Sequence, residues 1–136
     1  MDDNARRIMP TLNKDVQAAL SGLAKVSQLF ILKDRVPVPE PNILKWIEWF
    51  RQIEHRIVKY QRLTLRDGEQ GAVSTVFLGM THGMSEGEPL LFETVVLVGT
   101  RVIASQQYTT WEDAERGHCE IMDSIIQASH KERSQQ

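Results

Sequence analysis

Residues 73–98 read VSTVFLGMTHGMSEGEPLLFETVVLV, and this stretch decides the fold class. It holds two runs, 73–80 and 90–98, rich in β-branched and aromatic side chains that suit a pleated, half-buried surface. Both faces of each run are largely apolar, which predicts central strands covered on both sides. A polar, glycine-bearing loop between the runs carries His82, and Glu93 places a carboxylate inside the second run.

Length and composition indicate one ordinary globular domain. The chain has 136 residues, 41% of them hydrophobic and 25% charged, so a core can form without disulfides. The single cysteine, Cys119, excludes an internal disulfide and a multi-cysteine zinc site. A net charge of -2 argues against nucleic acid as a partner. Because no run could span a bilayer and no secretory signal is visible, we expect a cytoplasmic protein without membrane association.

The first 33 residues predict an amphipathic helix. Apolar residues recur at alternating spacings of four and three, as in the seam of a coiled coil. These residues are Leu12, Val16, Ala19, Leu23, Val26 and Phe30. We expect this helix to mediate a homodimer or to dock a partner protein, with folding back on its own sheet as the alternative. Three prolines in residues 34–41 then predict a stiff, extended connector.

The remaining chain predicts an α+β domain over residues 42–127, followed by a polar tail over 128–136. The expected elements are a helix at 41–52, strands at 56–65, 73–80, 90–98 and 102–108, and a helix at 111–127. Trp49 lies at the edge of the first helix's apolar stripe, which makes it a candidate interface residue. The fold class is therefore α+β, a small antiparallel β-meander of three to four strands packed with helices, and the N-terminal helix is either part of this domain or a separate unit.

Several short motifs, in this order, resemble a family of small uncharacterised proteins encoded by tailed bacteriophages and prophages. They are STVFLG with His82, then PLLFET, Tyr108, TWEDAE and the pair Gly117-His118. The resemblance covers residues 36–125, including VPVPEPNILKW. Thr81 stands where the family usually has an acidic residue before the histidine, and Leu97-Val98-Gly99 stands where it tends to have Phe-Gly. The resemblance implies a viral protein and no particular reaction.

Four polar residues at conspicuous positions are candidates for a site: His82, Glu93, Glu115 and His118. Glu115 and His118 share a helix face at a spacing that supplies metal ligands in some helical bundles. Together the four would suit zinc, manganese or iron, so a metal-dependent enzyme is one alternative function. We favour the structural alternative, in which His118 is buried against the sheet with a hydrogen-bond partner, and expect no cofactor and no tightly bound metal.

Arg56, Lys59 and Arg62 make the strand at 56–65 the most basic part of the sheet. They could bind a small anionic ligand such as a nucleotide, which is a second alternative function, or they could protect an edge strand from aggregation. No P-loop, dinucleotide fingerprint or Ser-His-Asp pattern is present. The sequence therefore favours a non-enzymatic phage accessory protein that binds a host protein or a virion component.

Overall fold

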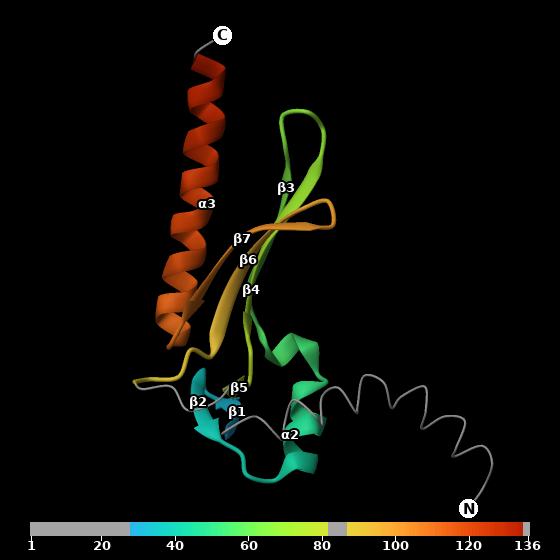
Figure 1. Cartoon of the computed structure of the whole chain (residues 1–136), viewed down its shortest axis with the longest axis vertical. Helices are drawn as coiled ribbons and strands as arrows, with labels where there is room; N and C mark the ends of the chain where they lie inside the picture. Colours follow the sequence, from blue (N-terminus) through green and yellow to red (C-terminus); the bar gives the residue numbers. More distant parts are fainter. Residues whose placement is uncertain (1–27, 82–86, 135–136) are drawn as a thin grey trace, which may run out of the picture.

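The computed structural model describes residues 28–81 and 87–134 and confirms a small α+β fold with antiparallel sheets. Figure 1 shows one long helix beside a four-stranded sheet, and a smaller three-stranded sheet at one end of it. In chain order the elements are β1 (Gln28–Lys33), β2 (Val36–Pro39), α2 (Ile43–Phe50), the 3-10 helix η1 (Ile53–His55), β3 (Ile57–Thr64), β4 (Gln70–Phe77), β5 (Met80–Thr81), β6 (Phe92–Val98), β7 (Arg101–Tyr108) and α3 (Trp111–Ser134).

The larger sheet has the strand order β3-β4-β6-β7, and each neighbouring pair is antiparallel. Its two central strands, β4 and β6, come from the stretch that the sequence singled out. In their register Thr75 lies opposite Thr94, and Phe77 lies opposite Phe92. The turn between β3 and β4 contains Gly68 with a φ of 85°, a conformation that glycine adopts without steric cost. The predicted meander is thus confirmed.

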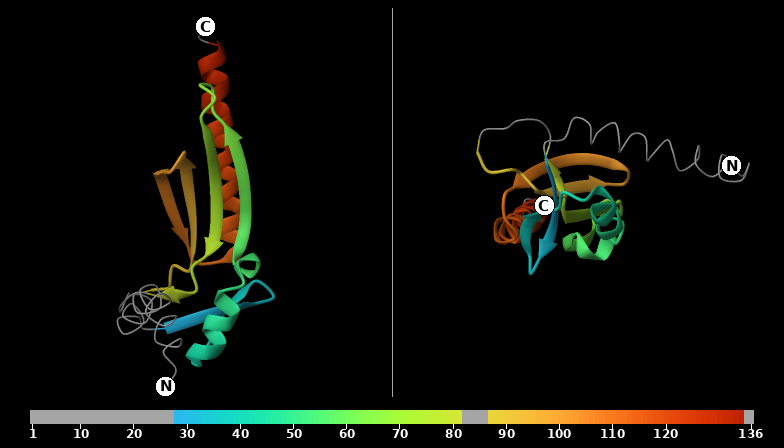
Figure 2. Two further views of the ribbon diagram at one scale, coloured as in Figure 1. Left: turned by 90° about the vertical axis from the view of Figure 1, so that its right-hand side faces the viewer. Right: turned by 90° about the horizontal axis from the view of Figure 1, so that it is seen from below.

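Among the described residues, one face of this sheet is covered by a helix and the other is not. Figure 2 shows α3 along a single face of the sheet. Alternate residues of β4 and β6 point towards α3 and are buried, namely Val73, Thr75, Phe77, Phe92, Thr94 and Val96. The residues on the other face, Ser74, Val76, Glu93, Val95 and Leu97, are only partly buried. Because α2 packs against β1 and leaves this face open in the described part of the chain, cover on both faces stays a prediction.

A tryptophan holds the smaller sheet to the end of the larger one. This sheet has the order β2-β1-β5, and α2 packs against β1. Trp46 of α2 is 3% exposed, and its indole N–H donates to the carbonyl oxygens of Phe30 and Gly79, each at 3.0 Å. Gly79 links β4 to β5, so this bifurcated bond fixes α2, β1 and the end of the central strand together.

The N-terminal boundary differs from the prediction. The helix predicted to include Phe30 does not reach it: Phe30 lies in β1, is 7% exposed and belongs to the main hydrophobic cluster. The other residues of the predicted stripe, Leu12, Val16, Ala19, Leu23 and Val26, lie outside the described residues. The proline-rich segment supplies β2, which pairs with β1 through a two-residue turn at Asp34 and Arg35. Prolines are tolerated there because β2 is an edge strand.

One boundary needs correction, and one candidate residue has a contact within the chain. The tail expected after residue 127 continues α3 to Ser134. Trp49 is half-buried and meets Phe77 edge-on, with ring centroids 5.7 Å apart, and its role at an interface stays a prediction.

Candidate functional site

His118 is the polar centre of the interface between α3 and the sheet. It is fully buried, as predicted from its place on the helix. The register of β4 and β6 sets Thr75 and Thr94 side by side beneath it. This polar layer lies between two hydrophobic clusters: one contains Phe77, Phe92, Tyr108 and Ala114, and the other contains Val73, Val96 and Met122.

Both ring nitrogens of His118 have hydrogen-bond partners. Nε2 lies 2.8 Å from Oε1 of Gln61, and Nδ1 lies 2.7 Å from Oγ1 of Thr75. The carbonyl oxygen of Gln61 can only accept, so Nε2 donates and Nδ1 accepts from the Thr75 hydroxyl. Thr94, 2.6 Å from Thr75, then donates to Thr75. The result is a directed chain of bonds that suits a neutral histidine.

The surroundings of His118 also favour its neutral form. Burial lowers the pKa of His118, and the positive charge of nearby Lys59 lowers this pKa further. Lys59 itself points its Nζ to within 3.5 Å of the Sγ of Cys119, which is exposed. The buried imidazole has both ring nitrogens engaged within the fold, so this cluster ties α3 to β3 and β4.

The three described residues of the set proposed for a metal site, Glu93, Glu115 and His118, do not come together. Glu93 lies on the open face, where its Oε2 accepts from Nε2 of Gln107 at 3.1 Å, while His118 lies on the covered face. Glu115 accepts from the indole N–H of Trp111 at 2.9 Å on the exposed side of α3. His82 lies outside the described residues. Within the described ranges, no group of three or more His, Cys, Asp or Glu residues could hold a metal ion.

The three basic residues of the first long strand are likewise separated. The Arg56 guanidinium lies over the Phe50 ring, 3.9 Å from its centroid, and burial lowers the pKa of Arg56. Lys59 faces α3 near Cys119. Arg62 pairs with Ala72 and therefore projects towards the open face. They do not form a common anion site.

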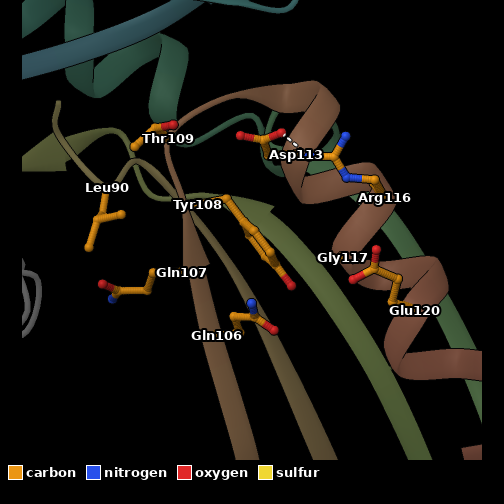
Figure 3. A pocket seen from close by; sticks show the side chains of 9 residues that line it. All are labelled: Leu90, Gln106, Gln107, Tyr108, Thr109, Asp113, Arg116, Gly117 and Glu120. Atoms are coloured by element: carbon orange, nitrogen blue, oxygen red, sulfur yellow. Dashed lines mark hydrogen bonds and ion pairs between the residues drawn. The ribbon is translucent and has the colours of Figure 1, made fainter. Parts of the chain in front are cut away.

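The most exposed strand of the larger sheet is the edge strand β7, which sequence reasoning did not identify as a site. Every residue of β7 except Tyr108 is exposed, and Val102 and Ile103 are 61% and 59% exposed. A cavity of about 320 Å³ lies between the end of β7 and the start of α3, and Figure 3 shows the residues around it. Its lining includes Gln106, Tyr108, Arg116, Gly117 and Glu120. We refer to β7 and this cavity together as the β7 surface.

Tyr108 and Gly117 shape the cavity together. Tyr108 is 7% exposed, and its buried hydroxyl has no hydrogen-bond partner among the described residues. In Figure 3 this hydroxyl ends between Gln106 and Glu120, beside Gly117. A Cβ on Gly117 would lie 2.3 Å from the hydroxyl oxygen, so only glycine allows the ring to lie flat against α3. The glycine is visible in the sequence as part of the Gly117-His118 pair, but the sequence does not show that Tyr108 packs against it.

Comparison with known proteins adds no relative, since no protein-family model, curated protein or solved structure matches this chain. Among the residues that the structure describes, none of the helices is long and apolar enough to cross a membrane. The function of this chain must therefore be inferred from its own structure.

Proposed function

We propose that this protein acts without catalysis, by binding another protein through the β7 surface. The observation that carries the proposal is the exposure of Val102 and Ile103 on a strand whose outer edge no other described strand pairs with. Exposed, long and apolar edge strands invite pairing with another chain, and proteins normally protect them. Leaving such an edge open is costly unless a partner covers it.

The two edges of the larger sheet support this proposal by contrast. The opposite edge strand, β3, carries Lys59 and Arg62, and charged side chains are a usual protection against unwanted pairing. β7 has no charged residue and no proline between Val102 and Tyr108. This part of β7 therefore lacks the charged side chains that protect β3, and it also lacks an edge proline.

The distribution of titratable groups favours binding over catalysis. Neither the proposed metal ligands nor the three basic residues share a cavity among the described residues. The polar network at His118 is satisfied within the fold. A binding surface needs only exposed area and unpaired backbone groups, which β7 provides.

The resemblance to phage proteins suggests where the partner would be found. We propose on this basis that the protein acts in the cytoplasm of an infected bacterium, with a host factor or a virion component as its target. A homodimer through the stripe from Leu12 to Val26 remains a separate prediction, because those residues are outside the described part of the chain.

Affinity purification from infected cells, followed by mass spectrometry, tests the proposal. We expect a protein in stoichiometric amount with the wild type, and its loss in Val102→Lys and Ile103→Lys variants. Leu44→Lys is the matched control, because Leu44 is 74% exposed on α2, away from β7. Equal recovery of the same protein with all four chains, or no stoichiometric protein with any of them, would contradict the proposal.

A further inference from the structure

We propose that the partner of the β7 surface is an extended, basic segment that adds to the sheet as a fifth strand and places a lysine or arginine side chain in the cavity beside Tyr108. This inference rests on the proposed function and names the chemistry of its partner. Three observations carry it: free backbone groups on β7, an unpartnered hydroxyl in the cavity, and the negative charge of α3.

The backbone of β7 offers hydrogen bonds in a defined direction. The carbonyl oxygen of Tyr108 accepts from the N–H of Leu91 at 3.0 Å, so it points towards β6. Backbone groups alternate along a strand, and those of Ser105 and Gln107 therefore point away from β6, along the free edge. An added strand would pair with these two residues. Such strand addition derives its affinity from main-chain bonds and its specificity from pockets for alternate side chains.

The cavity lies where one of those alternate side chains would arrive. Gln106 and Tyr108 point to the α3 side of the sheet, so a partner residue opposite Gln106 would project to the same side. There it would meet the Glu120 carboxylate beside the Tyr108 ring, whose unpartnered hydroxyl is itself buried. Arg116 is paired with Asp113, so the positive charge at the cavity is already engaged. The groups left for a ligand are mainly acceptors, which suit an ammonium or guanidinium donor.

The charge of α3 favours the same chemistry. Between residues 111 and 123 the helix has one basic residue, Arg116, and five acidic residues, Glu112, Asp113, Glu115, Glu120 and Asp123. His118 is neutral there, as its lowered pKa indicates. Complementary charge raises association rates and disfavours partners of like charge.

A second copy of this chain fits the surface less well. Pairing through β7 would bring two copies of the acidic α3 face to one side of a continuous sheet. β7 offers only Arg101 as a positive charge, and Arg101 already pairs with Glu69 at 3.4 Å. A basic partner segment meets no such repulsion.

Titration calorimetry with the full-length protein tests the inference. The probe is a capped seven-residue peptide of alternating valine and threonine with one central lysine. We expect it to bind about tenfold more tightly than the same peptide with glutamate at the centre. Methylation of the peptide nitrogens that face β7 should abolish binding, because it removes the main-chain donors without changing the protein.

Three variants of the protein test where the lysine side chain of the peptide binds. Glu120→Gln should weaken the lysine peptide by about threefold to tenfold and leave a neutral peptide unaffected. Tyr108→Phe should weaken the lysine peptide by about twofold to fivefold, because it removes only the hydroxyl. Glu115→Gln is the matched control: it removes one charge from the exposed side of α3, outside the cavity, and should change binding by less than about twofold.

Each alternative outcome overturns the inference in a distinguishable way. Equal affinity for the lysine and glutamate peptides, or an unchanged affinity in Glu120→Gln, would reject a basic partner. A dimer in light scattering that Ile103→Lys dissociates would show that a second copy occupies the edge. No peptide binding by a monomeric protein would also reject the inference. The proposed function would still stand in each case if Val102→Lys abolished co-purification of a host or phage protein.

Discussion

The two faces of the four-stranded sheet have similar side chains and different surroundings. Val96 faces α3 and is 5% exposed, whereas its neighbour Val95 faces the open side and is only partly buried. Both valines belong to one apolar run, and strand propensity treats them alike. The difference arises because one long helix follows the sheet in sequence and can cover only one face. An apolar run therefore predicts a strand more reliably than it predicts what covers it.

The covered face also contains the tight contact between Gly117 of α3 and Tyr108 of β7. A substitution at this contact should have the largest effect on stability. Gly117→Ala would place a Cβ 2.3 Å from Cε1 and from the hydroxyl oxygen of Tyr108. Such overpacking typically costs about 1–3 kcal/mol, more than the gain of up to about 1 kcal/mol from the better helix propensity of alanine. Chemical denaturation should show a clear net loss in the free energy of unfolding.

A second substitution at the contact provides the control. Replacing Tyr108 by leucine removes the ring atoms that the new methyl group would strike. We expect Gly117→Ala to cost less in the Tyr108→Leu background than in the wild type, because the two positions are in direct contact. A stabilising effect of Gly117→Ala in the wild-type background would show that α3 can move away from the sheet at no cost.

The adjacent valines of β6 give the most direct comparison of the two faces. Val96→Ala should lower the free energy of unfolding by about 2 kcal/mol, because it removes buried methyl groups and leaves a cavity beneath α3. Val95→Ala should cost less than about 1 kcal/mol, because its side chain is already partly in water. Urea denaturation of both variants measures the difference under identical conditions.

The reverse ranking would be informative. If Val95→Ala were the more destabilising change, the open face would be covered in solution by a part of the chain outside the described residues or by a second copy. Concentration-dependent stability would then separate the second copy from an intramolecular cover.

The sequence was sufficient for the central meander because its signals are local. Alternation, β-branched residues and the Asp-Gly turn specify β3, β4, β6 and β7 closely. The hairpin of β1 and β2 was missed for a physical reason. Its turn uses Asp34 and Arg35, with φ angles of 50° and 68°, instead of glycine, and its second strand contains prolines, which usually interrupt strands.

The candidate site was only partly predictable. The burial of His118 followed from its place on the apolar stripe of α3, and this prediction is confirmed. Its partners Thr75 and Gln61 come from strands 43 and 57 residues away, so they depend on sheet register and helix placement, which no local pattern reports. The β7 surface was not recognised, because its signal is an absence of charge on an edge strand and the edge is known only from the topology.

The smallest expected effect is a dependence of the free energy of unfolding on pH. It arises from His118, which is buried on the covered face. Because burial lowers the pKa of His118 in the folded protein, the unfolded chain binds a proton more readily than the folded one does. At pH values well above about 6.5, the ordinary pKa of histidine, His118 is neutral in both the folded and the unfolded chain and contributes no pH dependence. As the pH falls below this value, the free energy of unfolding should decrease, by at most about 1.4 kcal/mol per pH unit for one proton.

Denaturation curves between about pH 7.5 and pH 5.5 measure this slope above the main range of carboxylate titration. His118→Gln should remove the slope, because glutamine can occupy the polar layer without binding a proton. His55→Gln is the matched control, since the His55 side chain is exposed on η1 and lies outside the buried layer, so the wild-type slope should persist. Equal slopes in the wild type and in His118→Gln would show that other groups take up the protons on unfolding, and that the buried layer beneath α3 does not set the response of this fold to acid.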